Sequence, residues 1–172
     1  MSDEETTSAD LHKMVEALNA KFRSSESDLP VVDYQEVTSL SLSERVALWL
    51  AADVFLLTSI REGLNLMPLE YVYARRNLGY AGVVVASEYA ACSSLLSGSL
   101  KVNPFYTLSV ADTLHRAIEM GSKESSQRMQ RDLPFVANHP SSKWTREILH
   151  DLEVSKPTVD LHSGSSYSCS VT

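Results

Sequence analysis

Short, continuously apolar runs alternate with longer amphipathic segments along this chain. Residues 54–58 and 83–86 lack the polar alternation of a strand that has one wet face. Such runs are typical of strands buried on both faces of a parallel sheet. A third, shorter strand is expected at residues 100–102, where Asn103 and Pro104 end it. The pattern therefore predicts an α/β fold in which helices flank a parallel sheet.

Apolar positions at helical spacing predict the elements around these strands. A capping box of Ser41 and Glu44 is expected to open one helix, and Gly121 is expected to follow another as its C′ residue. Pro134 is expected to kink or break a third helix. Residues 30–37 are interpreted as a strand that enters from a turn. The expected helices cover residues 11–22, 41–51, 66–76, 109–120, 123–138 and 142–152.

Both ends of the chain differ in composition from the segment between them. Residues 1–9 are acidic and polar, and residues 153–172 are rich in serine and lack periodicity. Sequences of this kind bury too little apolar surface to fold, so both ends are expected to be disordered. Residues 10–152 are interpreted as one folded domain.

The overall composition restricts the classes of function. With 172 residues and 44% hydrophobic content, the chain is long enough for one domain with a core but too short for two Rossmann domains. Its 22 acidic and 15 basic residues give a formal net charge of -7, which argues against nucleic acid or an anionic membrane as a partner. No segment approaches the roughly 20 apolar residues of a membrane span, and the acidic start is unlike a signal peptide. We therefore expect a cytoplasmic protein.

Neither the cysteines nor the histidines form a metal-binding pattern. The two cysteines are far apart, and the five histidines are scattered without ligand spacing. Cys92 follows a predicted strand and is expected to be a small buried hydrophobic residue. Trp49, Phe55 and Trp144 are likewise expected in the core. We therefore predict no metal site.

The most informative stretch is a strand, a glycine turn and a helix between residues 54 and 71. In such a unit the first backbone N–H groups of the helix lack partners and face the crevice beyond the carboxyl end of the strand, where an anion is held. Asn65 is expected to be the N-cap of this helix, with Pro68 in its first turn. Glu62 and Glu70 flank the turn with seven residues between them, so both carboxylates are placed to face a sugar nucleotide.

Simpler interpretations exist for each of these charges. On spacing alone, Glu62 and Glu70 are two solvated carboxylates that the helix dipole favours. Arg61 is interpreted equally well as a phosphate contact or as one side of a salt bridge across the turn. Glu88 either reaches the same crevice or caps the following helix. The two arginines at positions 75–76 are interpreted as the basic end of a helix, complementing its dipole.

The turn carries a specific resemblance to a known family. Residues 61–66, Arg-Glu-Gly-Leu-Asn-Leu, followed by Glu70 and Tyr71, resemble the donor-site motif of trehalose-6-phosphate synthases, retaining glycosyltransferases built from two Rossmann-like domains. The resemblance covers about residues 12–152 and implies a partial, Rossmann-like donor-binding domain from the C-terminal half of a GT-B type enzyme. The further matching segments, in the family's order, are residues 40–53, 82–90 and 100–104 and the helix of Trp144.

The resemblance also implies an activity and a set of site residues. Members of the family transfer glucose from UDP-glucose to glucose 6-phosphate with retention of configuration, without a metal or a cofactor. The residue at Glu62 contacts hydroxyls of the transferred glucose and is the catalytic candidate, and the carboxylate at Glu70 binds the ribose of UDP. The backbone of the turn holds the diphosphate. The implied UDP-glucose site consists of Glu62, Gly63, Leu64, Asn65, Leu66 and Glu70.

Departures from the family pattern leave alternatives open. The family usually has Asp at the position of Glu62 and Met at that of Leu64, and a carboxylate misplaced by about 1 Å can cost roughly a hundredfold in rate. Related retaining glycosyltransferases nevertheless use two glutamates at this spacing. The family's first domain and its cationic diphosphate clamp have no counterpart here, so this chain alone is expected to be inactive. The alternatives are a regulatory or scaffolding subunit that associates with other trehalose-synthase subunits, or a truncated chain.

Overall fold

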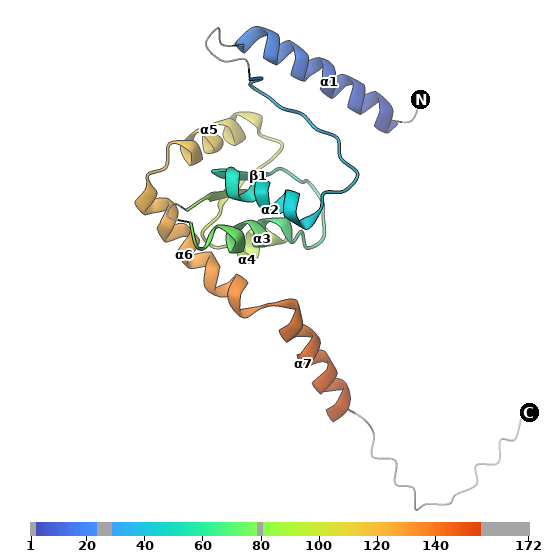
Figure 1. Cartoon of the computed structure of the whole chain (residues 1–172), viewed down its shortest axis with the longest axis vertical. Helices are drawn as coiled ribbons and strands as arrows, with labels where there is room; N and C mark the ends of the chain where they lie inside the picture. Colours follow the sequence, from blue (N-terminus) through green and yellow to red (C-terminus); the bar gives the residue numbers. More distant parts are fainter. Residues whose placement is uncertain (1–2, 24–28, 79–80, 156–172) are drawn as a thin grey trace, which may run out of the picture. The chain divides into compact units, whose positions relative to one another are not determined.

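The computed structural model describes residues 3–23, 29–78 and 81–155 of the chain (Figure 1). The described residues fall into two compact units, divided between Leu42 and Ser43. The first unit holds one helix and an extended segment, and the second holds a parallel sheet with its helices. The elements are α1 (Asp3–Phe22), α2 (Leu42–Ala51), β1 (Val54–Leu57), α3 (Met67–Arg75), β2 (Val83–Ser87), α4 (Cys92–Leu95), β3 (Leu100–Val102), α5 (Thr107–Ile118), α6 (Ser122–Asn138) and α7 (Ser141–Val154).

Helix α1 begins well before the amphipathic segment that predicted it. Residues 3–9 were expected to be disordered, and they are helical. Helix propagation explains the difference, because each added residue gains a hydrogen bond once a turn has formed, and neither proline nor glycine interrupts the sequence up to Phe22. Lys21 in the last turn also complements the helix dipole.

The strand expected at residues 30–37 is not formed in the described part of this segment. The side chain of Asn19 forms the two backbone hydrogen bonds that a neighbouring strand would otherwise form with Val32. Its Nδ2 donates to the Val32 carbonyl and its Oδ1 accepts from the Val32 N–H, both at 2.8 Å. The side-chain amide thus satisfies both backbone groups of Val32, which therefore needs no strand partner.

The second unit is built on a three-stranded parallel sheet in the order β1-β2-β3. Val54 pairs with Val83 and Val85 pairs with Leu100 in the register. Every residue of β2 is buried, as the apolar run predicted. The predicted α/β class with a parallel sheet is confirmed.

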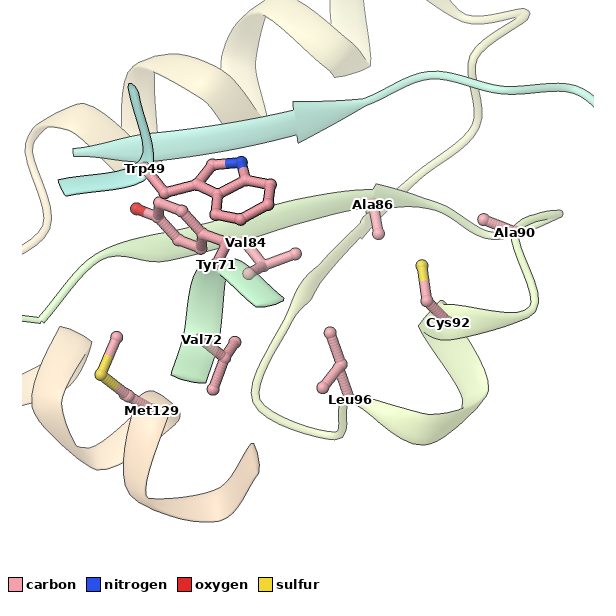
Figure 2. Packing of buried hydrophobic residues seen from close by; sticks show 9 residues of the cluster. All are labelled: Trp49, Tyr71, Val72, Val84, Ala86, Ala90, Cys92, Leu96 and Met129. Atoms are coloured by element: carbon pink, nitrogen blue, oxygen red, sulfur yellow. The ribbon is translucent and has the colours of Figure 1, made fainter. Parts of the chain in front are cut away.

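Helices cover both faces of the sheet and build two hydrophobic clusters. On one face Val83 and Val85 pack with Leu100, Val102 and Ala117 of α5. On the other face Val84 and Ala86 pack against residues of α2, α3, α4 and α6, as Figure 2 shows. Trp49 and Cys92 lie in this second cluster, as predicted, and Phe55 packs against it. Its buried members are Trp49, Tyr71, Val72, Val84, Ala86, Ala90, Cys92, Leu96 and Met129.

Helix α2 starts directly after Ser41, where the capping box placed it, but the boundary between α5 and α6 differs from the prediction. Helix α5 ends with Glu119 as its C-cap, so Gly121 is not its C′ residue. Gly121 is instead the N-cap of α6, with extended angles of φ -64 and ψ 148. Helix α6 continues through Pro134 without the break that was one expectation. Packing of Leu133 and Val136 against the core holds this part of the helix in place.

Helix α7 buries none of its residues. Trp144, which was expected in the core, exposes 66% of its surface. Its predicted apolar face with Ile148 and Leu152 therefore lacks a covering element among the described residues. The helix extends through Val154, two residues into the segment expected to be disordered, and residues 156–172 of that segment lie outside the described residues. Within the described ranges no helix combines the length and apolar character that a membrane crossing requires.

Candidate functional site

The turn between β1 and α3 lies at the carboxyl edge of the sheet. Strands β1 and β2 are parallel, with Leu57 beside Ala86, so the turn after β1 and residues 88–89 after β2 leave the sheet at the same edge. Open α/β sheets hold ligands outside this edge. The structure therefore brings together the two segments in which the sequence placed candidate site residues.

The Asn65 side chain caps a backbone N–H at the start of α3. Its Oδ1 accepts a hydrogen bond of 2.9 Å from the Met67 N–H, which is the bond of an N-cap side chain. The helix is assigned from Met67 with Leu66 as N-cap, one residue later than predicted, but Leu66 already has helical angles and its carbonyl accepts from the Glu70 N–H. Pro68 is buried in the first turn, as expected.

Glu62 is half-buried and held by its neighbour. The Asn65 side-chain amide donates to Glu62 Oε2 at 3.4 Å. Glu62 Oε1 is buried and accepts no hydrogen bond within the described structure. Burial raises the pKa of the Cys92 thiol, and the Glu62 carboxylate raises that pKa further. Glu62 therefore lies near Cys92, the first residue of α4.

The centre of the turn is open. A Cβ at Gly63 would meet no atom within 4 Å, and no described glycine has a positive φ, so neither space nor backbone conformation within the chain requires glycine here. Leu64 and Leu66 each expose more than half of their side chains. Their backbone N–H groups donate no hydrogen bond in the part of the chain that the structure describes. The turn thus presents free donors on an uncovered surface.

Glu70 is half-buried in the first turn of α3 and lies next to a residue that the sequence analysis missed. The Arg45 guanidinium of α2 has its Nη1 3.9 Å from Glu70 Oε2. The same guanidinium lies over the Trp49 ring, 5.6 Å from its centroid. Arg45 and Trp49 are four residues apart on one helix, a spacing that brings side chains together. This spacing could have predicted the contact between Arg45 and Trp49 from the sequence.

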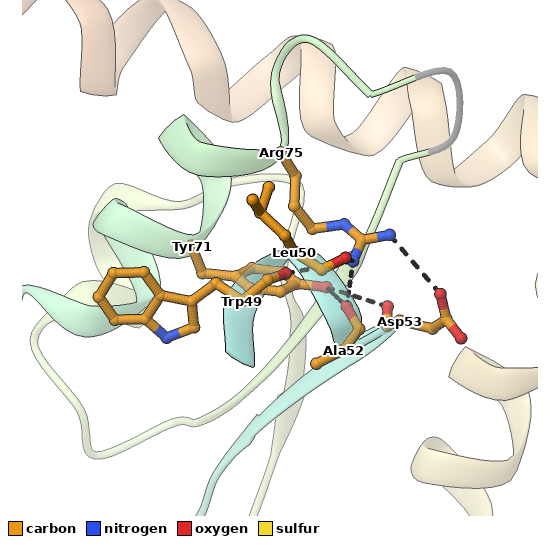
Figure 3. A network of polar contacts seen from close by, with 6 residues as sticks. All are labelled: Trp49, Leu50, Ala52, Asp53, Tyr71 and Arg75. Carbon is orange, nitrogen blue, oxygen red and sulfur yellow. Dashed lines mark hydrogen bonds and ion pairs between the residues drawn. The ribbon is translucent and has the colours of Figure 1, made fainter. Parts of the chain in front are cut away.

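A buried polar network fixes α3 to the beginning of β1 (Figure 3). Tyr71 Oη donates to the carbonyls of Ala52 and Asp53, each at 3.0 Å. Arg75, whose surface is fully buried, donates to the carbonyls of Trp49 and Ala52 and pairs with the Asp53 carboxylate at 3.6 Å.

Arg75 is the basic residue in the last turn of α3, as predicted, but the partners of its side chain were not predicted. Its guanidinium satisfies carbonyl groups at the end of α2, which the sequence does not place beside α3. Arg76 also matches the interpretation, since its Nη1 donates to the Tyr73 carbonyl in the last turn of α3.

The remaining candidates contribute less to the described site. Glu88 is exposed, and α4 has Ala91 as N-cap without a side-chain capping bond, so Glu88 does not cap that helix. Arg61 forms no ion pair within the described residues, which removes the salt-bridge interpretation. No group of three or more potential metal ligands occurs in the described ranges.

Comparison with known proteins finds a family match and several relatives. Residues 1–154 match Glycosyltransferase family 20. One relative is the UDP-forming alpha,alpha-trehalose-phosphate synthase 6 of Arabidopsis thaliana. It is 31% identical over 160 residues, and the match covers 84% of this chain and 18% of the plant protein.

Solved structures share the fold. A Burkholderia xenovorans alpha,alpha-trehalose-phosphate synthase in complex with glucose-6-phosphate is 26% identical, with a TM-score of 0.76 over 87% of this chain and 32% of that one. An E. coli structure bound with UDP-2-fluoro glucose is 25% identical, with a TM-score of 0.78 over 89% of this chain and 33% of that one. The chain thus spans about a third of these solved proteins.

Proposed function

The chain belongs to Glycosyltransferase family 20, and we propose that it forms the donor-binding part of a retaining synthase that transfers glucose from UDP-glucose to glucose 6-phosphate. The observation that carries the proposal is the turn between β1 and α3. Among the described residues, Ser59 Oγ and Glu62 Oε1 are buried there without hydrogen-bond partners, and the N–H groups of Leu64 and Leu66 donate no hydrogen bond. Buried polar atoms left unpaired cost free energy, so their accumulation at one turn favours a polar ligand.

Each group of the turn suits one part of a sugar nucleotide. The N–H groups of Leu64 and Leu66 at the start of α3 would donate to the diphosphate, and the open surface over Gly63 would admit it closely. Glu62 would accept hydrogen bonds from hydroxyls of the transferred glucose, and Glu70 from the ribose. These roles are those that the family resemblance implies.

The same turn would also stabilise the transition state of the transfer. The bond between the glucose anomeric carbon and the diphosphate breaks, and a bond forms from that carbon to a hydroxyl oxygen of glucose 6-phosphate, whose proton passes to the departing diphosphate. Negative charge develops on the departing diphosphate, and N–H donors fixed at a helix N-terminus stabilise it. A metal ion is not needed for this stabilisation. Solved relatives carry glucose-6-phosphate in one case and UDP-2-fluoro glucose in another, which supports both substrates for this chain.

Two further parts of the proposal concern the surroundings of the chain. Other trehalose-synthase subunits are proposed partners, as expected for a regulatory or scaffolding member of the family. A cytoplasmic location is proposed as well, and the buried, free thiol of Cys92 is compatible with a reducing compartment.

Titration with UDP tests the proposal. A helix N-terminus contributes only roughly 0.3–2 kcal/mol, and a millimolar dissociation constant corresponds to about 4 kcal/mol. The proposed hydrogen bonds of Glu62 and Glu70 must supply the difference, so we expect binding no tighter than millimolar, measured by changes in the NMR spectrum of the full chain. Glu70→Gln should weaken it, whereas Glu147→Gln on α7 removes the same charge at an exposed position and should not. An NMR spectrum that does not change at UDP concentrations well above the millimolar range would refute donor binding and favour the scaffolding alternative.

A further inference from the structure

Arg45 lies beside the candidate donor site, and no motif of the turn accounts for it. Its Nη1 is 3.9 Å from Glu70 Oε2, and the two side chains expose 30% and 35% of their surfaces. An ion pair that is exposed to solvent contributes little to stability. Here, however, Glu70 Oε2 and Arg45 Nε are themselves buried and have no hydrogen-bond partner among the described residues. The pair is thus placed at the boundary between the core and the site.

The core holds the guanidinium in place. Arg45 lies over the ring of Trp49, which is 7% exposed and belongs to the same cluster as Tyr71 (Figure 2). Tyr71 directly follows Glu70 in α3 and donates to backbone carbonyls before β1. Arg45 is therefore one helical turn before the buried ring of Trp49, and Glu70 directly precedes the buried ring of Tyr71. A cation anchored in this way loses little further entropy when it pairs with a carboxylate.

The orientation of the carboxylate follows from this arrangement. A buried, ionised oxygen without a hydrogen bond is costly unless an opposite charge faces it, and Arg45 is the cation within 4.0 Å of Glu70 in the described structure. The attraction commits Oε2 to Arg45 and leaves Oε1 to accept hydrogen bonds from a ligand.

We propose that Arg45 is a positioning residue that orients Glu70 for recognition of the ribose hydroxyls of the donor nucleotide. The inference rests on the proposed function, because it concerns the same site. Arg45 acts through Glu70 and does not itself contact the nucleotide.

Comparison of UDP with 2′,3′-dideoxy-UDP tests this role. A hydrogen bond to a charged group corresponds to about tenfold or more in affinity, so the wild-type chain should prefer UDP by about that factor. Arg45→Met and Glu70→Gln should each reduce the preference toward onefold while changing the affinity for the dideoxy analogue little. The double variant should lose no more than Glu70→Gln alone, because both changes remove one interaction. Arg45→Lys keeps the charge and should restore part of the preference.

Controls separate this role from loss of folding and from failure of the proposed function. Arg146→Met removes a cation from exposed α7 and should keep the full preference, and thermal unfolding reports whether each variant is folded. If Arg45→Met does not fold, the preference of Arg45→Lys decides between an orienting and a merely structural role. UDP binding with an unchanged preference in the folded Arg45 variants would refute the positioning role alone. No UDP binding by the wild-type chain would refute the proposed function together with it.

Discussion

Gly82 lies against the buried side chains of Tyr71 and Arg75, and its replacement by alanine tests how tightly this network is packed. A Cβ at position 82 would lie 1.9 Å from Tyr71 Oη, 2.6 Å from Tyr71 Cζ and 2.7 Å from Arg75 Nε. Contacts this short do not occur, so the phenol and the guanidinium must move. A shift of more than about 1 Å breaks the hydrogen bonds that Tyr71 donates to Ala52 and Asp53.

Two contributions set the magnitude. Forcing an extra carbon into a packed core costs about 1–3 kcal/mol, and leaving buried polar groups unpaired costs about 1–3 kcal/mol more. Gly82→Ala should therefore lower the free energy of unfolding by about 2–6 kcal/mol. That is a large part of the roughly 5–15 kcal/mol by which a typical domain is stable.

Urea denaturation followed by circular dichroism at 222 nm measures the effect. Gly63→Ala is the matched control, because a Cβ there meets no atom within 4 Å. It should change the free energy of unfolding by less than about 0.5 kcal/mol. Equal stability of the two alanine variants would refute the tight packing of Gly82 against the network.

Three further predictions concern the site and a buried carboxyl group. In a full-length synthase, Glu62→Gln should abolish turnover and leave the affinity for UDP nearly unchanged. Turnover assays measure this, and a wild-type rate in the variant would remove Glu62 from the mechanism. Gly63→Ala should weaken UDP binding several-fold with little change in stability, as NMR titration would measure, because its Cβ occupies surface proposed to receive the diphosphate. Burial raises the pKa of Asp132 above its ordinary 3.8, an effect that the Gly98 N–H donating to its carboxylate opposes. The folded state therefore binds this proton more tightly, and the contribution of Asp132 to stability should rise as the pH falls through its raised pKa and be complete below 3.8. Urea denaturation of wild type and Asp132→Asn across this range should show a pH-dependent difference, and a constant difference would contradict the raised pKa.

The sequence predicted the elements whose formation depends on local pattern. The runs that became β1 and β2 are apolar without alternation, and both form strands of a parallel sheet. Burial on both faces is confirmed for the central strand β2 only, because β1 lies at the edge of the sheet, is half-buried and exposes Leu56. Ser41 and Glu44 likewise placed the start of α2 correctly. The turn could be recognised because its chemistry is contained in ten consecutive residues, 61–70.

The failures concern residues whose environment is set by distant parts of the chain. Val32 was assigned to a strand, but its backbone pairs with the side chain of Asn19, 13 positions earlier. Arg75 does lie at the end of its own helix, as predicted, but the partners of its guanidinium lie 22 or more positions away, around the junction of α2 and β1. Trp144 has the spacing of a core residue, although no described element covers it. Periodicity predicts that a face is apolar and does not identify what packs against it.

Helix α3 joins the stability of the fold to the geometry of the candidate site. Glu70 and Tyr71 are consecutive, so they point in different directions from the helix, one toward Arg45 and the turn and the other into the buried network. A shift of the Tyr71 backbone also moves Glu70, because the two residues share a peptide bond. The buried network of Tyr71 and Arg75 therefore does more than stabilise the junction of α2 and β1. It fixes the position of the carboxylate that we propose binds the nucleotide, which explains why a site on a short turn needs such costly buried polar groups beneath it.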